Sequence, residues 1–373
     1  MSSLFSEFTL GSPRGPLTLS NRVVVAPMCQ YSSHDGLAND WHLTHWTNLL
    51  NSGASLFIIE ATAVTARGRI TPGCLGLWDD ATAAALSDNL QRARRLAPAT
   101  PVCIQLAHAG RKASSAVPWE GGQLLDAAHL GWQPEAPSAL PHLPNETPPD
   151  AISAQGLHDI CQAFVHAAQR ADAMGIDAVE LHAAHGYLLH EFLSPLSNQR
   201  SDGYGGNFEG RIRFPLEVFQ AVRAVYKGSL GMRISASDWV EGGWTPEETA
   251  DFALRLKAAD ADFVHISSAG VSPLQKIAVG PEYQVPFAKL VKQKTGLPTI
   301  AVGLITDPQQ ANDIVARGDA DLVALARAFM YKPRWVWEAA AALGGTVKAS
   351  PQYWRCLPRE AQSVFGDVRI GMR

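Results

Sequence analysis

The chain has 373 residues, of which 46% are hydrophobic, so it can bury a large core. Its 31 basic and 35 acidic residues give a net charge of −4 without a basic block, which gives no electrostatic support for nucleic-acid binding. The scattered cysteines contain no CxxC pair and are expected to be reduced thiols. Because no signal-peptide pattern and no run of about 18 apolar residues occurs, we expect a soluble, cytoplasmic protein with no membrane partner.

Eight short aliphatic runs recur along the chain and alternate with segments that have helical spacing of apolar residues. The runs span Arg22–Ala26, Leu56–Glu60, Val102–Leu106, Ala178–His182, Met232–Ser235, Phe263–Ser267, Thr299–Val302 and Leu322–Leu325. The helical segments include Leu157–Met174, Ile212–Val225, Pro246–Ala259, Tyr283–Lys294 and Pro308–Arg317. Most runs are apolar on both faces, as in buried parallel strands. The pattern predicts a single α/β domain over residues 1–373, a (β/α)8 TIM barrel. An open doubly wound sheet is disfavoured because no GxGxxG follows the first strand.

Two segments interrupt this alternation. Phe8–Leu19 places glycines and prolines between apolar residues, which predicts an N-terminal hairpin that closes the bottom of the barrel. Residues 107–152 follow the third strand and are rich in Pro, Gly, Trp and His. Because a loop of this length in a compact domain usually carries function, these residues are predicted to form a lid-like capping insertion.

Polar or small residues follow several of the predicted strands. They are Met28, Cys29, Gln30, Ala61, Thr62, His182, Ser235, Ala236, Ser237, Gly303 and Arg327. In a TIM barrel the C-terminal ends of the strands build the active site, so we expect these residues to surround it.

The segment VELHAAHGYLLHEFLS (Val179–Ser194) places His182, His185 and Tyr187 at the end of the fourth strand. Two imidazoles can donate hydrogen bonds to one carbonyl or nitro oxygen and stabilise the negative charge that develops when hydride adds to a conjugated carbon. A phenol close by can supply the proton. These three residues are therefore the predicted catalytic and substrate-binding centre.

An HxxH pattern also occurs in metal sites and among structural histidines. No third His, Cys or carboxylate stands at a strand end with the spacing of an open catalytic zinc site, so no metal is predicted. A second HxxH, formed by His42 and His45, lies in a predicted helix and is interpreted as structural. A non-catalytic or metal-dependent TIM barrel that merely shares the fold remains an alternative, because fold does not determine function.

Four segments resemble the Old Yellow Enzyme family. They are APMCQYS (Ala26–Ser32), QLAHAGRK (Gln105–Lys112), HAAHGYLLHEFLSPLSNQRSDGYGG (His182–Gly206) and MRISASD (Met232–Asp238). The resemblance extends from Thr18 to the C-terminal PQYWR and is greatest to the bacterial "thermophilic-like" ene-reductase and xenobiotic reductase subgroup. It implies a tightly but non-covalently bound FMN, NADPH or NADH as the reductant, and a homodimer or homotetramer.

The resemblance also implies a role for each matching residue. The residues that should lie beside the flavin are Ala26, Pro27, Met28, Cys29 and Ala61. In this subgroup the strand-one cysteine, here Cys29, tunes the reduction potential of the flavin; the alternative is an inert buried thiol. Ala61 leaves room beside the flavin ring, and Tyr31 should reach into the substrate pocket.

Further matches concern the pyrimidine and phosphate ends of the cofactor. Gln105 resembles the glutamine that hydrogen-bonds the pyrimidine edge of the flavin. Arg233 resembles an arginine near its N1–C2=O edge, where a cation stabilises the anionic reduced form. Gly303 and Arg327 follow the seventh and eighth strands, where TIM barrels commonly bind phosphate. Ala326 stands where the family usually has glycine.

The C-terminal tail, residues 346–373, departs from a simple barrel end. In the related subgroup an arginine near this point enters the active site of a neighbouring subunit. Arg355 matches that arginine, and Trp354 could line the same pocket. An ordinary surface tail is the alternative, since the chain continues beyond Arg355.

The resemblance predicts an NAD(P)H-dependent ene-reductase with a ping-pong cycle. NAD(P)H reduces FMN, and flavin N5 then passes hydride to an α,β-unsaturated carbonyl or nitro compound, such as an enone, enal, maleimide or nitroalkene. His182 and His185 hold the activating oxygen, and Tyr187 protonates the α-carbon. Another FMN barrel, similar to dienoyl-CoA reductases or dihydroorotate dehydrogenases, is the alternative. Larger dienoyl-CoA reductases add an iron–sulfur site and a further domain, for which this chain lacks the cysteine cluster and the length.

Overall fold

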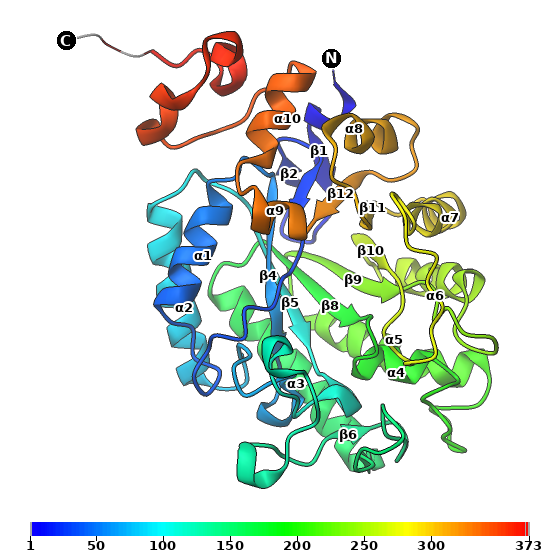
Figure 1. Ribbon diagram of the computed structural model, residues 1–373. Helices are drawn as coiled ribbons and strands as arrows, with labels where there is room; N and C mark the ends of the chain where they lie inside the picture. Colours follow the sequence, from blue (N-terminus) through cyan, green and yellow to red (C-terminus); the bar gives the residue numbers. More distant parts are fainter. Residues whose placement is uncertain (1, 370, 372–373) are drawn as a thin grey trace.

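A closed barrel of eight parallel strands forms the centre of the computed structural model, which describes residues 2–369 and 371 (Figure 1). The strands are β3 (Val23–Val25), β4 (Leu56–Ala63), β5 (Val102–Ala107), β8 (Ala178–Ala183), β9 (Ser229–Ser235), β10 (Phe263–Ser267), β11 (Thr299–Ala301) and β12 (Leu322–Leu325). Each strand pairs with the next in chain order, and β12 pairs with β3 to close the ring. The predicted (β/α)8 TIM barrel is confirmed.

Helices lie outside the strands and cover the barrel (Figure 1). They are α1 (Asp40–Leu50), α2 (Asp80–Arg95), α3 (Ala154–Ala173), α4 (Leu188–Leu193), α5 (Phe208–Val225), α6 (Pro246–Ala258), α7 (Val285–Thr295), α8 (Pro308–Ala316), α9 (Arg327–Tyr331) and α10 (Trp335–Leu343). Several begin at a side chain that accepts a backbone N–H, as Thr245 does for α6 and Asp307 for α8. Within the part of the chain that the structure describes, none of these helices combines the length and apolar character needed to cross a membrane.

The bottom of the barrel is closed by the hairpin of β1 (Phe8–Leu10) and β2 (Leu17–Leu19). Leu10 and Leu19 are fully buried and belong to the same apolar cluster as Leu56 and Phe263 inside the barrel. Burial of this apolar surface provides the driving force that holds the hairpin against the strands. The predicted N-terminal hairpin is confirmed.

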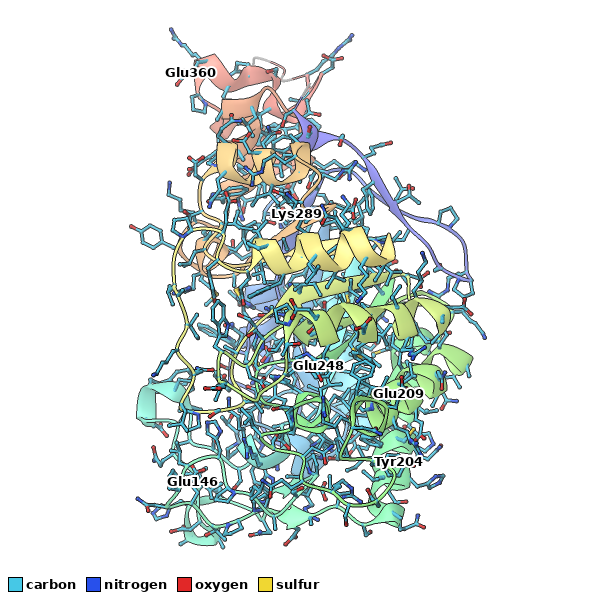
Figure 2. All side chains as sticks on the ribbon, turned by 90° about the vertical axis from the view of Figure 1, so that its right-hand side faces the viewer. Glu146, Tyr204, Glu209, Glu248, Lys289 and Glu360 are labelled. Atoms are coloured by element: carbon cyan, nitrogen blue, oxygen red, sulfur yellow. The ribbon has the colours of Figure 1, made fainter. Side chains whose placement is uncertain are left out.

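The segment between β5 and α3 contains short 3-10 helices and the two-stranded sheet of β6 (Glu135–Ala136) and β7 (Asp150–Ala151). The C-terminal tail contains two further 3-10 helices, Pro351–Cys356 and Arg359–Phe365. Figures 1 and 2 show these two segments at opposite ends of the molecule, marked in Figure 2 by Glu146 and Glu360.

One strand of the barrel is irregular next to a predicted flavin contact. In β4 the pairing with β5 shifts between Ile59 and Thr62, so the two residues between them, Glu60 and Ala61, face a single residue of β5, Gln105. Such a bulge bends the strand locally and changes the direction of its side chains, and bulges are frequent next to active sites.

Candidate active site

The three residues predicted as the catalytic centre lie together at the C-terminal end of β8. The imidazole of His182 contacts that of His185 edge to face, with ring centroids 5.1 Å apart, and the ring of Tyr187, with centroids 4.9 Å apart. His185 Nε2 lies 2.7 Å from the hydroxyl of Ser267, at the end of β10. The loop brings together side chains that are close in sequence, whereas Ser267 comes from a distant strand.

A strained loop holds His185 in place. Its φ of 59° is in the left-handed region, which is uncommon for residues other than glycine. The backbone N–H of His185 donates to Ser235 Oγ over 2.9 Å, and its carbonyl oxygen accepts from Lys112 Nζ over 3.0 Å. The next residue, Gly186, has no room for a side chain, because a Cβ would lie 2.1 Å from the carbonyl oxygen of Gly270. These contacts stabilise a conformation that the sequence alone would not favour.

Both histidines are neutral at physiological pH. Burial, reinforced by the charge of Arg233, holds the pKa of His182 and of His185 well below the usual value of the side chain. His182 Nδ1 accepts the N–H of Ala184 over 3.2 Å, so the single proton of its ring is on Nε2. The site therefore presents a neutral imidazole N–H, which can donate a hydrogen bond to a substrate oxygen.

Tyr187 is in its protonated form. Burial raises the pKa of this phenol well above its usual value, and the nearby thiol of Cys29 and phenol of Tyr31 raise it further. The Nζ atom of Lys112 lies 5.4 Å from the centre of the Tyr187 ring. A phenol that keeps its proton can act as a hydrogen-bond donor or as a proton donor.

Cys29 and Tyr31 lie in the loop after β3 and close to Tyr187. Burial, followed by the neighbouring Glu60, raises the pKa of the Cys29 thiol well above its usual value, so the sulfur is protonated. A protonated thiol is a poor nucleophile, which does not favour a covalent role for this residue. Tyr31 has a φ of 50° and contacts Trp119 of the insertion edge to face, with ring centroids 6.0 Å apart.

Ala61 is buried in the irregular part of β4, and its neighbour Glu60 is a buried carboxyl. Glu60 Oε2 accepts the backbone N–H of Gln30 over 2.8 Å, whereas Oε1 lies 3.8 Å from His42 Nε2. Burial raises the pKa of Glu60 to about 8. His42 is fully buried and its Nδ1 accepts the N–H of Asn39 at the start of α1, as expected of a structural histidine.

Gln105 and Arg233 line the interior of the barrel, together with two residues that the sequence reasoning did not identify. Glu180 Oε1 accepts from Gln105 Nε2 over 2.7 Å, and Glu180 Oε2 lies 2.8 Å from His265 Nδ1. Glu180 and His265 are fully buried. The signal for them was present in the sequence, since each is an ionisable residue flanked on both sides by apolar residues within a strand, in VEL and VHI.

A cavity of about 190 Å³ lies where the seventh and eighth strands end. Its lining includes the predicted residues Arg233, Gly303, Ala326 and Arg327, together with Tyr283. Gly303 has a φ of 123°, and a Cβ there would lie 2.8 Å from Gln284 Nε2, so glycine is required. Ala326 has a φ of −113° and a ψ of −82°, so its φ is not in the left-handed region that requires glycine.

The residues around this cavity fit a phosphorylated flavin. Arg233 Nε is a buried donor without a hydrogen-bond partner among the described residues, as expected where a ligand supplies the acceptor. Arg327 begins α9 and can pair with a phosphate, while the backbone at Gly303 can approach the anion closely. Gln105, Arg233, Gly303 and Arg327 would hold FMN, which would supply hydride transfer at this site.

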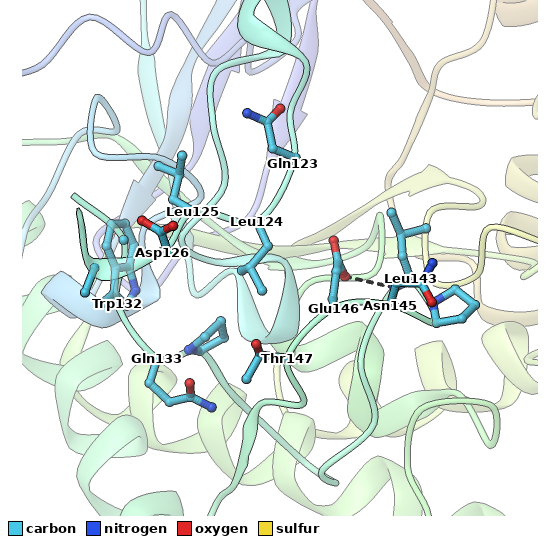
Figure 3. A pocket seen from close by; sticks show the side chains of 14 residues that line it. Gln123, Leu124, Leu125, Asp126, Trp132, Gln133, Leu143, Asn145, Glu146 and Thr147 are labelled. Carbon is cyan, nitrogen blue, oxygen red and sulfur yellow. Dashed lines mark hydrogen bonds between the residues drawn. The ribbon is translucent and has the colours of Figure 1, made fainter. Parts of the chain in front are cut away.

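Two larger cavities lie in the insertion. One of about 760 Å³ is lined by residues 123–127, 131–134 and 143–147 and contains no residue predicted for the site (Figure 3). The other, of about 730 Å³, shares the wall Gln123–Asp126 with the first and is also lined by Tyr31 and Trp119. The insertion therefore contacts the predicted substrate pocket through Tyr31.

Trp354 and Arg355 lie away from these residues. Trp354 packs against the core of its own chain and donates to the carbonyl oxygen of Ala349 over 3.1 Å. Arg355 is exposed and donates to the carbonyl oxygen of Gly371 over 3.3 Å. Neither residue lines the cavities that contain Arg233 or Tyr31. Among residues 2–369 and 371, moreover, no group of three or more His, Cys, Asp or Glu is arranged to hold a metal ion.

Comparison with known proteins agrees with this site. Residues 3–344 match the NADH:flavin oxidoreductase / NADH oxidase family. The chain is 42% identical to the NADPH dehydrogenase of Geobacillus sp. (strain WCH70), over 94% of this chain and 98% of that protein. It is 39% identical to the NADPH dehydrogenase of Listeria innocua, over 95% and 99%. Among solved structures, morphinone reductase matches with a TM-score of 0.73 and 27% identity, over 94% of this chain and 92% of that one.

The barrel and its site thus define a flavin-dependent oxidoreductase of the TIM-barrel class. The chain belongs to the NADH:flavin oxidoreductase / NADH oxidase family and is an FMN-dependent enzyme of the Old Yellow Enzyme type. The family resemblance stated from the sequence is confirmed.

Proposed function

We propose that this enzyme uses NADPH, or NADH, to reduce the activated C=C bond of α,β-unsaturated carbonyl or nitro compounds. The observation that carries the proposal is that His182 contacts both His185 and Tyr187. Both imidazoles are neutral and the phenol is protonated. Neutral donors and a proton source in one pocket suit a reaction in which negative charge develops on an oxygen and a carbon then takes a proton.

Each residue has a distinct task in this proposal. FMN bound at this site would supply the hydride transfer of a ping-pong cycle, from NAD(P)H and then from flavin N5 to the β-carbon of the alkene. His182 and His185 donate hydrogen bonds to the substrate oxygen and stabilise the negative charge that develops on it. Tyr187 gives its proton to the α-carbon and regains one from water. Tyr31 lines the other side of the pocket, with Trp119 behind it.

The cofactor contacts are part of the same proposal. The residues that would contact the flavin ring, from the loop after β3 and from β4, are Ala26, Pro27, Met28, Cys29 and Ala61. Because the pKa of Cys29 is raised, the residue acts on the flavin as a neutral thiol. The insertion 107–152 caps the pocket, and residues 1–373 form a single FMN-binding domain.

The tail is proposed to contact a second copy of the chain. Arg355 is exposed and makes only one hydrogen bond within the described residues, to a carbonyl oxygen, so its charge is free to pair with a group of a neighbouring subunit. A homodimer or homotetramer would bring such a tail to a neighbouring site. Measurement of the oligomeric state with and without residues 346–373 tests this part separately.

A single cuvette experiment tests the reaction. The absorbance of the purified protein is followed under anaerobic NADPH and again after addition of 2-cyclohexenone. We expect a flavin spectrum that bleaches with NADPH and returns with the enone. Bleaching without recovery would leave the flavin enzyme and reject the alkene substrate, whereas a colourless protein that takes up no FMN would reject the proposal altogether.

A further inference from the structure

A buried hydrogen-bonded pair inside the barrel, a glutamate and a histidine, is not used by the roles assigned above. Glu180 of β8 and His265 of β10 meet across the strand that separates them, with Oε2 and Nδ1 2.8 Å apart. The residue of β9 that pairs with Glu180 is Gly231. A side chain there would meet the ring of Phe263, with a Cβ 2.5 Å from it. Glycine at this position leaves the interior open for the pair to form.

The second oxygen of Glu180 determines how the side chain of Gln105 is oriented. Gln105 Nε2 donates to Glu180 Oε1 over 2.7 Å, and the two residues face each other in the register of β5 and β8. A glutamine amide can be turned in two ways that differ only in which end is the donor. A carboxylate can only accept, so Glu180 directs the nitrogen of Gln105 toward itself and leaves the amide oxygen for another partner.

Glu180 also supplies the negative charge that Arg233 needs. Arg233 has 8% of its surface exposed, and no ion-pair partner contacts it among the described residues. Burial would raise the pKa of Glu180, but His265, Arg233 and Gln105 outweigh it and lower the pKa, so the carboxyl is ionised. A buried cation without a compensating anion is strongly unfavourable.

We propose that Glu180 is a positioning residue of the flavin site, which orients Gln105 and sets the balance of charge beneath the pyrimidine edge. The inference rests on the proposed flavin contacts of Gln105 and Arg233. The negative charge of Glu180 opposes the additional negative charge of reduced flavin. Glu180 therefore keeps the reduction potential of the bound cofactor lower than Arg233 alone would set it.

The test measures FMN binding rather than turnover. Apoprotein of the wild type and of Glu180→Gln is titrated with oxidised FMN and, anaerobically, with reduced FMN. Glutamine keeps the size of the side chain and can still accept from Gln105 while donating to His265. Because one negative charge is lost, we expect the ratio of the dissociation constants, oxidised over reduced, to rise about fivefold or more. A ratio within twofold of the wild-type value would overturn the proposal.

Two further variants separate charge from position. Glu180→Asp keeps the charge but withdraws it from Gln105, so both forms of FMN should bind more weakly by a similar factor, with an unchanged ratio. A ratio that rises in Glu180→Asp as well would contradict the charge effect, and this variant serves if Glu180→Gln fails to fold.

Asp262→Asn removes a carboxylate just before β10, at the opposite end of the barrel, and should leave the ratio unchanged. Wild-type apoprotein that binds no FMN would reject the proposed function itself.

Discussion

Lys112 Nζ donates a hydrogen bond of 3.0 Å to the carbonyl oxygen of His185. This bond joins the segment after the third barrel strand to the loop after the fourth, and the same Nζ also donates to Gly270 after β10 over 3.2 Å. A single ammonium group thus connects three loops around the predicted catalytic centre. Burial of this group between the loops lowers the pKa of Lys112 to about 8.

The variant Lys112→Met should slow reduction of the alkene about tenfold or more while the enzyme keeps its FMN. Without the ammonium group, the left-handed backbone of His185 loses one of the two hydrogen bonds made by its own N–H and carbonyl groups, and a displaced donor stabilises the substrate oxygen less well. Rapid-mixing measurement of the two half-reactions checks this. An alkene half-reaction that proceeds at the wild-type rate would show that Ser235 alone holds the loop.

The variant Tyr187→Phe should leave reduction of the flavin by NADPH nearly unchanged and slow alkene reduction by about 10²-fold or more, as for loss of a general acid. The phenyl ring keeps the contact with His182 and loses only the hydroxyl. Anaerobic stopped-flow absorbance measures each half-reaction separately. Equal losses in both would contradict the role of Tyr187 as proton donor, and little loss in either would identify solvent as the donor.

The variant Glu60→Gln should make the stability less dependent on pH between pH 4.5 and 8. In the unfolded chain this carboxyl loses its proton near pH 4.5, whereas in the folded protein it keeps it up to about pH 8. The unfolded state is therefore favoured as pH rises through this window, by up to about 1.4 kcal/mol per pH unit. The contribution of the protonated Glu60 carboxyl to the free energy of unfolding is therefore fully present below pH 4.5, and it is lost as the pH rises to about 8.

Thermal unfolding at a series of pH values measures this effect. Glutamine can still accept the N–H of Gln30 but cannot ionise, so the variant should gain stability relative to the wild type as pH rises. Glu338→Gln, which removes a carboxylate paired with Lys332 at the surface, is the matched control and should follow the wild-type profile. Parallel profiles for Glu60→Gln and the wild type would mean that Glu60 is already ionised at neutral pH.

The variant Gly303→Ala should reduce the affinity for FMN about tenfold or more. Its Cβ would lie 2.8 Å from Gln284 Nε2 at the wall of the phosphate cavity, and the φ of 123° is unfavourable for alanine. Gly318→Ala is the matched control, because Gly318 also has a positive φ, 73°, but a Cβ there has nothing within 4 Å. Both variants carry a backbone penalty of about 1 kcal/mol, so a loss of FMN in both would assign the effect to backbone strain rather than to the cavity.

Much of the barrel could be predicted from the sequence because its signals are local. The eight apolar runs became the eight strands, and the helical spacing of segments such as Leu157–Met174 marked the helices between them. The predicted position of the site rests on the same alternation, since parallel strands in a barrel carry their C-terminal ends to one face. The motif around His182 placed three chemically active side chains within six residues of one another.

Only the tertiary structure decided which distant residues complete the site. Ser267 lies beside His185, Lys112 reaches the carbonyl oxygen of the same residue, and Glu180 meets His265 across a glycine of β9. The bulge at Glu60 likewise depends on how β4 pairs with β5. Periodicity records which face of an element is buried. The register in which the strands close the barrel determines which buried polar groups meet, and closure depends on packing over the whole chain.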